Sequence, residues 1–516
     1  MHFTRRDVLK LGALTGAAVT FPFGHSALAS HRDGGSGGAS PAFTPYTRRL
    51  PIPQRLLPVS STAVRDTYAI TMKAGTAEIL PGVATPIWGY NGHYPGPLLR
   101  TRSRRQVVVQ QTNALAVPTS IHTHGAYVDG DSDGHPSDKI APGATKTYTF
   151  GNDQNARTQW YHDHADHITA RNAYRGLSGF YLIDDDFDDA LPLPKGEYDV
   201  PIVIQDRRFN ADGTLFYPSD PAVAATDAGF QGDVLVANGK AQPFAPVAAR
   251  RYRFRFLNGS NARPYLLRLS NGRSFKLIAT EGGLLEAPVT LKELPIWPAE
   301  RYEVVMDFSG LPVGSSVFLD NGYGQGSVAR ILRFDVVRTE ADPSSVPAVL
   351  RPVAAQADAT HIATTQAAAV LTRTWKFGKS WDGMYTINGK IYDELRIDAF
   401  PKEGDTEIWE FDNGFGWSHP VHVHLLNFKI LDRNGNPPKT HERGWKETVH
   451  LGPGEKVRVL MQWPTVPIGP TPGEFLTRYA FHCHNLEHED HDMMTQFRVD
   501  APGTTAAPAP VPVQHR

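Results

Sequence analysis

The sequence has only one cysteine, Cys483, among 516 residues. An intrachain disulfide is therefore excluded, and this thiol needs an explanation of its own. The charges are almost balanced, with 52 Lys and Arg against 53 Asp and Glu. No excess of positive charge favours binding to nucleic acid. The partners must therefore be inferred from a specific site.

Long hydrophobic runs are also missing, and we expect no membrane span. The apolar run at 11–23 is too short to anchor the chain; it follows Arg5-Arg6 and precedes a small-x-small motif at 27–29. These features predict a Tat-type signal peptide over 1–29, with an ordinary Sec signal as the alternative. We therefore expect an exported protein, periplasmic or extracellular.

The rest of the chain is rich in short apolar or alternating runs bounded by Gly, Pro, Asn and Asp, as at 106–110, 251–257 and 456–462. Such spacing is typical of β-sandwiches and barrels. An ordered set of features occurs three times: an Asn-Gly turn, a β-rich run that ends in asparagine, and a proline turn that leads into an alternating strand. The turns begin at Asn91, Asn238 and Asn388, the runs end at Asn113, Asn258 and Asn413, and the proline turns open 142–150, 298–308 and 453–463. We predict an all-β fold of three consecutive Greek-key sandwich or barrel domains, with chance recurrence of Asn-Gly turns as the alternative.

Composition sets the predicted boundaries. Gly/Ser-rich and Pro/Ala/Thr-rich stretches are typical of flexible segments. We predict a flexible lead-in at 30–42, domains at 43–190, 191–345 and 371–500, a linker at 346–370, and a disordered tail at 501–516.

Four segments place histidines two residues apart, a spacing that points both imidazoles to one face of a β-strand. All four lie in the first and third predicted domains, and the matching stretch of the second, 261–269, has none. Histidine is the commonest metal ligand at neutral pH, so the pattern predicts metal binding rather than surface or structural histidines. The pairs are His122/His124, His162/His164, His422/His424 and His482/His484.

The lone cysteine indicates which metal. Two histidines, one cysteine and a weak methionine suit a blue copper centre for electron transfer, and His419, Cys483, His488 and Met493 supply that set. Strand alternation sends Cys483 to one face and its two flanking histidines to the other. An electron received at the cysteine can then reach a second copper cluster through a few covalent bonds. The alternative is a buried, inert thiol.

On these motifs the chain resembles the multicopper oxidases, and among them the bilirubin oxidases and the bacterial spore-coat-type laccases. The resemblance covers nearly the whole mature chain and implies three cupredoxin-like domains with four copper ions per chain. It implies a type 2 copper at His122 and His422, and a type 1 copper at His419, Cys483, His488 and Met493, with Met494 the less suited axial ligand. It implies a type 3 copper pair at His124, His162, His164, His424, His482 and His484.

Carboxylates follow two of the ligand motifs. The resemblance implies that Asp133 and Glu489 deliver protons for oxygen reduction. Acidic turn residues and hydrogen-bond partners of ligand histidines look the same in sequence, and this is the alternative. The resemblance also implies that Asn485 tunes the type 1 site by hydrogen bonding. Five further histidines near the motifs are expected not to be ligands: His135, His167, His441, His450 and His491.

The resemblance implies a laccase-like enzyme, a monomer, that oxidises phenols or other electron-rich aromatic molecules and reduces dioxygen to water. A metal oxidase acting on Mn(II), Fe(II) or Cu(I) is the main alternative. The chain has 7 methionines and no cluster of them beyond Met493-Met494, which disfavours Cu(I), because soft thioethers suit that ion. A non-enzymatic cupredoxin scaffold would require missing ligands, and none is missing.

Overall fold

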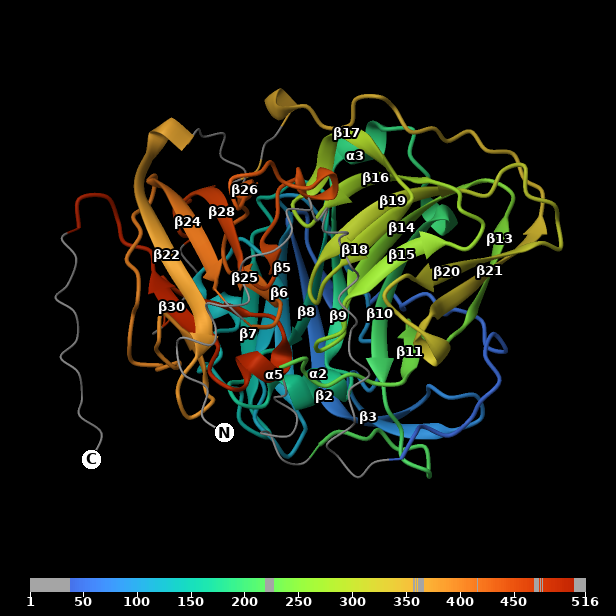
Figure 1. The fold of residues 1–516 in the computed structure, drawn as a ribbon, viewed down its shortest axis with the longest axis horizontal. Helices are drawn as coiled ribbons and strands as arrows, with labels where there is room; N and C mark the ends of the chain where they lie inside the picture. Colours follow the sequence, from blue (N-terminus) through green and yellow to red (C-terminus); the bar gives the residue numbers. More distant parts are fainter. Residues whose placement is uncertain are drawn as a thin grey trace, which may run out of the picture. The chain divides into compact units, whose positions relative to one another are not determined.

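Strands dominate the computed structural model (Figure 1). It describes residues 38–218, 227–355, 358, 360, 366–414, 416–467, 473, 475 and 477–504, all within one compact unit, Gly37–Arg516. The strands form three pairs of sheets in chain order, and each pair is called a domain below. The fold prediction is therefore confirmed.

The first domain has one sheet in the order β1-β2-β5-β7, with β3 on β2, and another in the order β4-β9-β8-β6. Alternation along β2 sends Tyr68, Ile70 and Met72 into the core between them. The bounds are β1 Ser60–Ser61, β2 Arg65–Glu78, β3 Ala84–Tyr90, β4 Leu99–Arg102, β5 Gln106–Asn113, β6 Ile121–His124, β7 Thr145–Phe150, β8 Arg157–Asp163 and β9 Ser178–Asp184.

The second domain has sheets in the orders β12-β11-β10-β14-β19-β16-β17 and β13-β21-β20-β15-β18. Its core contains Phe254, Phe256 and Phe334. The bounds are β10 Asp199–Arg207, β11 Val234–Ala237, β12 Lys240–Ala241, β13 Phe244–Ala248, β14 Arg251–Asn258, β15 Tyr265–Leu269, β16 Phe275–Thr280, β17 Gly283–Leu291, β18 Glu293–Ile296, β19 Arg301–Asp307, β20 Ser316–Asn321 and β21 Arg330–Arg338.

The third domain has sheets in the orders β23-β22-β24-β28-β26 and β27-β25-β29-β30. Its core contains Trp409, Phe481 and Cys483. The bounds are β22 Ala369–Lys379, β23 Tyr385–Ile387, β24 Thr406–Asn413, β25 His419–Val423, β26 Lys429–Arg433, β27 Thr448–Leu451, β28 Glu455–Gln462, β29 Arg478–Cys483 and β30 Met494–Arg498.

The helices are short. Two of them, α2 and α5, lie side by side (Figure 1), and α1 and α5 carry residues of the candidate site. The bounds are α1 Gly130–Asp133, α2 Thr169–Tyr174, α3 Asp186–Ala190 and α5 Leu486–Glu489, with 3-10 turns η1 Gly196–Tyr198, η2 Gly326–Val328, η3 Val353–Ala355, η4 Gln366–Ala368 and η5 Thr440–Glu442. Among the described residues no helix is long and apolar enough to cross a membrane.

The repeated asparagines do the same work in each domain. The turn residues Asn91, Asn238 and Asn388 all have positive φ, which asparagine tolerates well, and each side-chain oxygen accepts a backbone N–H at 2.8 Å. The strand-end residues each donate their side-chain amide to two carbonyl oxygens: Asn113 to Val117 and Ile140, Asn258 to Arg263 and Ile296, Asn413 to Trp417 and Gly452. We call this pair of asparagines the asparagine latch.

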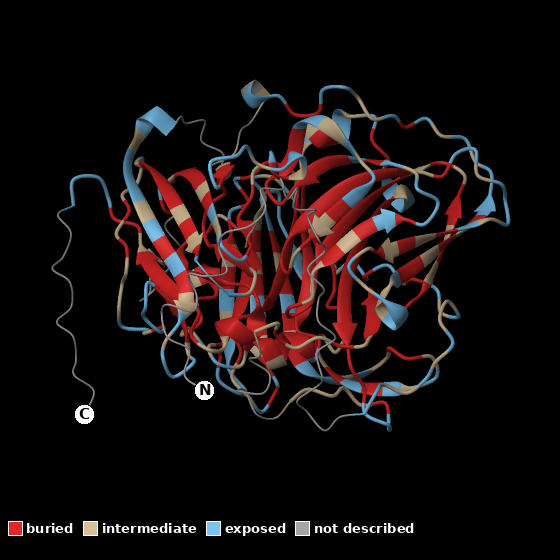
Figure 2. Cartoon of the chain, in the orientation of Figure 1, coloured by how far each residue is buried: buried red, intermediate tan, exposed pale blue. Residues whose placement is uncertain are grey.

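Most strand residues are buried (Figure 2). The first half of β22, by contrast, is mostly exposed. The boundaries drawn from composition stay predictions; β22 begins at Ala369, at the end of the expected linker. The expected signal peptide, most of the lead-in and residues 505–516 of the tail lie outside the described residues.

Candidate metal centres

The four histidine pairs are presented by four strands. His122 on β6 lies opposite His162 on β8, and His422 on β25 lies opposite His482 on β29. Directly opposed residues of antiparallel strands project from the same face. The second histidine of each pair follows two residues later, at His124, His164, His424 and His484, and all eight side chains are buried.

The eight imidazoles meet through their Nε2 atoms in three groups. His124 Nε2 lies 3.0 Å from Nε2 of both His162 and His484. His482 Nε2 lies 3.1 Å from His164 Nε2 and 3.3 Å from His424 Nε2. His122 Nε2 lies 3.3 Å from His422 Nε2. Every group joins the first domain to the third.

The Nδ1 atoms of seven of these rings face oxygen acceptors. Backbone carbonyls face four of them and carboxylates face the other three, and His482 faces the Glu489 carboxylate as well as its carbonyl. The backbone partners are Asp133 for His122, Asp163 for His162, Glu447 for His422 and Cys483 for His482; the carboxylate partners are Glu447 for His124, Glu489 for His164 and Asp133 for His424.

This arrangement fixes the tautomers, because a ring that donates from Nδ1 leaves a lone pair on Nε2. Burial, together with the neighbouring imidazoles, lowers the pKa of His122, His124, His162, His422 and His424 well below the ordinary value. Uncharged rings that point lone pairs at one another at hydrogen-bond distance have no proton to share between them. The donor set therefore fits metal ions, and imidazole nitrogen suits copper.

Asp133 lies at the end of α1, whose first turn is capped by the Asp129 side chain. Its Oδ2 is 2.6 Å from His424 Nδ1, and its backbone oxygen accepts from His122 Nδ1. Burial raises the pKa of the Asp133 carboxyl well above its ordinary value. The next residue is Gly134, where a Cβ atom would lie 2.1 Å from the backbone oxygen of Ile121, so only glycine lets α1 approach β6 this closely.

Glu489 lies on α5 and bridges two histidines. Its Oε1 is 3.1 Å from His164 Nδ1 and its Oε2 is 2.9 Å from His482 Nδ1. Burial alone would raise its pKa, but His482 and His164 outweigh this and hold the pKa well below the ordinary value. Both carboxylates that the sequence singled out therefore touch the histidine groups.

A separate group forms around the cysteine. Cys483 Sγ lies 3.4 Å from His419 Nδ1 and 3.7 Å from His488 Nδ1, and these two nitrogens are 3.2 Å apart. All three residues are buried, and burial raises the pKa of the thiol. Two imidazoles and one thiolate form the trigonal donor set of a blue copper centre.

The two methionines lie in different clusters. Met493 is buried in the same core as Cys483, whereas Met494 packs in another cluster with Tyr392 and Ala480. Asn485 also meets this group: its backbone N–H points at Cys483 Sγ at 3.4 Å, and its side-chain amide lies 3.1 Å from His488 Nε2.

The five further histidines near the motifs lie outside these groups. His135 is bonded to Gln496, His450 stacks on Trp297, and His167 is exposed. None of the five, which include His441 and His491, belongs to a group of three potential ligands in the part of the chain that the structure describes.

Sequence reasoning missed several residues around the groups. Tyr385 stacks on His488 at 4.0 Å between ring centroids, and the Asp227 backbone oxygen lies 3.2 Å from His488 Nε2. Glu447 and Arg301 meet near His124. No spacing rule pairs these residues with the histidines, because each arrives from a distant part of the chain.

Family models described as multicopper oxidase match residues 71–188, 196–325 and 355–503. The chain is 34% identical to a laccase from Bacillus subtilis, over 89% of this chain and 99% of that protein. It is 37% identical to a bilirubin oxidase from Albifimbria verrucaria, over 89% and 82% of the two chains. A crystal structure of a laccase from Pediococcus acidilactici superposes with a TM-score of 0.79 at 30% identity, covering 90% and 95%.

The chain therefore belongs to the multicopper oxidase family. It is a laccase-like, copper-dependent oxidase that uses dioxygen as its electron acceptor.

Proposed function

We propose that this enzyme oxidises phenols or other electron-rich aromatic molecules one electron at a time and reduces dioxygen to water with four copper ions per chain. One observation carries the proposal: Cys483, in the cysteine-centred group, lies between His482 and His484, which belong to two different groups of Nε2 atoms. The end of β29 thus links the cysteine-centred group, which would receive electrons, to the histidine groups, which would transfer them to dioxygen.

The grouping of the side chains supports the following ligand roles. His419, Cys483, His488 and the buried Met493 would hold the type 1 copper, and His122 with His422 the type 2 copper. The type 3 pair would be held by His124, His162 and His484 on one side and by His164, His424 and His482 on the other. Bound copper supplies one-electron redox chemistry at each of these sites.

Electron transfer within the protein would use covalent bonds. From Cys483 Sγ the route runs through the cysteine side chain and the backbone to the imidazole of either neighbouring residue. Because alternate residues of β29 face opposite ways, Cys483 lies in the third-domain core while His482 and His484 face the first domain.

Protons would reach the cluster through Asp133 and Glu489. Asp133 Oδ2 lies against His424, and the two oxygens of Glu489 lie against His164 and His482. The Asp133 carboxyl, whose pKa is raised, would hold a proton beside the histidine groups and pass it inward, a general-acid role. The Glu489 carboxylate, whose pKa is lowered, would relay protons by accepting and then releasing them.

The aromatic substrate would deliver its electron at His488, where Tyr385 already presents a ring and Asp227 an oxygen. We further propose that residues 1–29 direct export of the enzyme by the Tat route and that it works as a monomer. Sequencing the N-terminus of the exported protein and measuring its mass in solution test these two points.

The main test measures copper per chain, the blue absorption band and oxygen uptake in the parent, in Cys483→Ser and in His482→Gln. His135→Gln is the matched control, since His135 is a buried histidine outside the groups. We expect C483S to lose the blue band, H482Q to keep it but to lose oxygen uptake, and H135Q to behave like the parent. A parent that binds no copper would contradict the proposal. Oxygen uptake driven by Mn(II), Fe(II) or Cu(I) but not by phenols would overturn its substrate.

A further inference from the structure

A buried ion pair connects the second domain, which places no residue in the three Nε2 groups, to the metal centres. Arg301 opens β19, Glu447 lies just before β27, and Arg301 Nη1 donates to Glu447 Oε1. Both side chains are 0% exposed. Removing two charges from water is costly, and the pair needs excellent geometry and further hydrogen bonds to offset that cost.

Glu447 reaches two of the proposed ligands at once. Its Oε1 lies 3.3 Å from His124 Nδ1, and its backbone oxygen lies 3.1 Å from His422 Nδ1. The two rings stack with centroids 3.9 Å apart. His124 comes from the first domain and His422 from the third, so one residue aligns ligands across the interface.

Arg301 is itself held in place by the first domain. Its Nε donates to the backbone oxygen of Thr158 at 3.1 Å, and its Nη1 also donates to Ala299 O at 2.9 Å. Thr158 lies on β8, the strand that carries His162.

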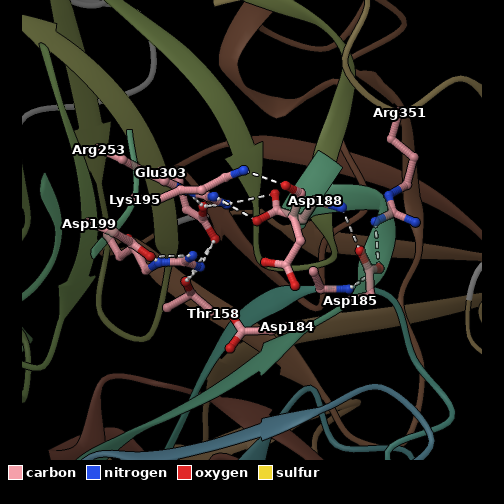
Figure 3. Close-up of polar contacts among 12 residues, drawn as sticks. Thr158, Asp184, Asp185, Asp188, Lys195, Asp199, Arg253, Glu303 and Arg351 are labelled. Carbon is pink, nitrogen blue, oxygen red and sulfur yellow. Dashed lines mark hydrogen bonds and ion pairs between the residues drawn. The ribbon is translucent and has the colours of Figure 1, made fainter. Parts of the chain in front are cut away.

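A second residue of β19, two positions after Arg301, also contacts β8. The Thr158 hydroxyl donates to Glu303 Oε1 at 2.8 Å, and Glu303 also accepts from Arg253 (Figure 3). Arg301 and Glu303 therefore project from the same face of β19 onto β8.

The sequence leaves room for this contact. Gly125 follows His124 with φ of +77°, and a Cβ atom there would lie 2.5 Å from Glu447 Oε2 and 3.2 Å from Arg301 Nη2. Any side chain at this position would push the ion pair away from His124.

We propose that Glu447 and Arg301 are positioning residues for the three-copper cluster, an inference that rests on the proposed function. The Glu447 carboxylate holds His124 in the tautomer with hydrogen on Nδ1, so that Nε2 stays free to bind copper. Arg301 fixes the direction of that carboxylate. The second domain thus aligns copper ligands of the other two domains without supplying one.

The test compares Glu447→Ala and Glu447→Gln with Glu442→Gln as the matched control. Glu442 is also a buried glutamate of the third domain paired with an arginine, Arg433, and it contacts no proposed ligand. Metal-free protein is titrated with Cu(II) against a competing chelator, and copper per chain, the copper EPR spectrum and the blue band are recorded. Kinetics with a phenol give kcat and KM separately.

We expect E447A to bind copper at the histidine groups about 10- to 100-fold more weakly, the usual cost of losing a partner of a ligand histidine. Its kcat should fall in proportion, while KM and the blue band stay like those of the parent. The copper affinity and kcat of E447Q should lie between those of the parent and those of E447A, because its amide oxygen still accepts from His124. E442Q should bind copper as the parent does.

Parent-like copper affinity and EPR spectra in E447Q and E447A would overturn the inference. If E447A fails to fold, E447Q decides: equal copper affinity in E447Q and E442Q would overturn it, and weaker binding in E447Q alone would support it. A parent without copper would instead reject the proposed function, so the two failures are distinguishable.

Discussion

The cysteine-centred group and the eight-histidine groups differ in where their ligands come from. His419, Cys483, His488 and Met493 all belong to the third domain. Cys483 and Met493 lie in its apolar core, and the two histidines stack on Phe377 and Tyr385 of that core. The histidine groups take four rings from residues 122–164 and four from residues 422–484, and each group spans the two domains. One site depends on the packing of a single core, whereas the other depends on the docking of domains.

This difference explains the distribution of buried polar side chains. Cys483 lies in an apolar core with Phe481, Val421 and Trp409, and the polar neighbours of the group include Asn485 and the backbone oxygen of Asp227. The histidine groups are surrounded by Asp133, Glu489 and the Glu447–Arg301 pair. A site assembled from two domains needs directional bonds to set the distance between them, and apolar packing alone is less directional.

Cys483→Ser should give the largest loss of activity. It should remove copper binding at the cysteine-centred group but not at the histidine groups. We expect complete loss of the blue band and of phenol-driven oxygen uptake, because the thiolate ligand and the covalent route disappear together. Copper at the histidine groups should remain, as measured by copper per chain. Loss of all copper from this variant would show that the two sites are not independent.

Asp133→Asn should weaken the histidine groups and leave the cysteine-centred group unchanged. We expect copper affinity at the histidine groups or kcat to fall about 10- to 100-fold, because the Asp133 carboxylate accepts from His424 Nδ1. The blue band should persist. Asp131→Asn, in the same helix but bonded to Gly473 and Phe475, is the control and should match the parent. Equal losses in the two variants would refute a specific role for Asp133.

Asn485→Ala should perturb only the cysteine-centred site. His488 Nε2 keeps the Asp227 oxygen but loses the Asn485 amide, so KM or the rate of phenol oxidation should change about 2- to 10-fold, the size expected for one hydrogen bond. Oxidation of the pre-reduced enzyme by dioxygen should be unchanged, which stopped-flow absorption can measure. A change in that step alone would contradict the assignment.

Glu281→Gln should leave activity intact and alter the pH dependence of stability. Burial and the neighbouring Glu300 raise the pKa of Glu281 from 4.5 to about 7, against the opposing charge of Lys446. The folded protein therefore keeps a proton that the unfolded chain releases, so this contribution to stability is full below pH 4.5 and is lost as pH rises to about 7.

Denaturant unfolding of metal-free parent and E281Q over this pH range tests the point. The fall in stability with rising pH should be shallower in E281Q. Parallel curves for the two proteins would show that Glu281 does not carry the effect.

Much of the candidate site could be predicted from sequence because its signals are local. A spacing of two places both histidines on one strand face, and the same alternation separates Cys483 from His482 and His484. The asparagine latch was visible for the same reason, since its turn and strand end follow each other in every domain.

The supporting residues could not be predicted in this way. Arg301 and Glu447 are 146 positions apart, and Glu447 is 323 positions from His124. Neither stands in a motif, and in sequence Lys446-Glu447 reads as an ordinary exposed pair. Only the docking of three domains places these charges together, and local patterns carry no information about docking.

The asparagine latch occurs in all three domains, whereas the histidine pairs occur only in the first and the third. The second domain keeps the latch at Asn238 and Asn258 with the same bonds as its neighbours, yet its strands carry no histidine pair. The second domain therefore offers the same backbone framework without a pair of histidine ligands. Histidines introduced where the other domains carry theirs would start from a backbone that already has the required form.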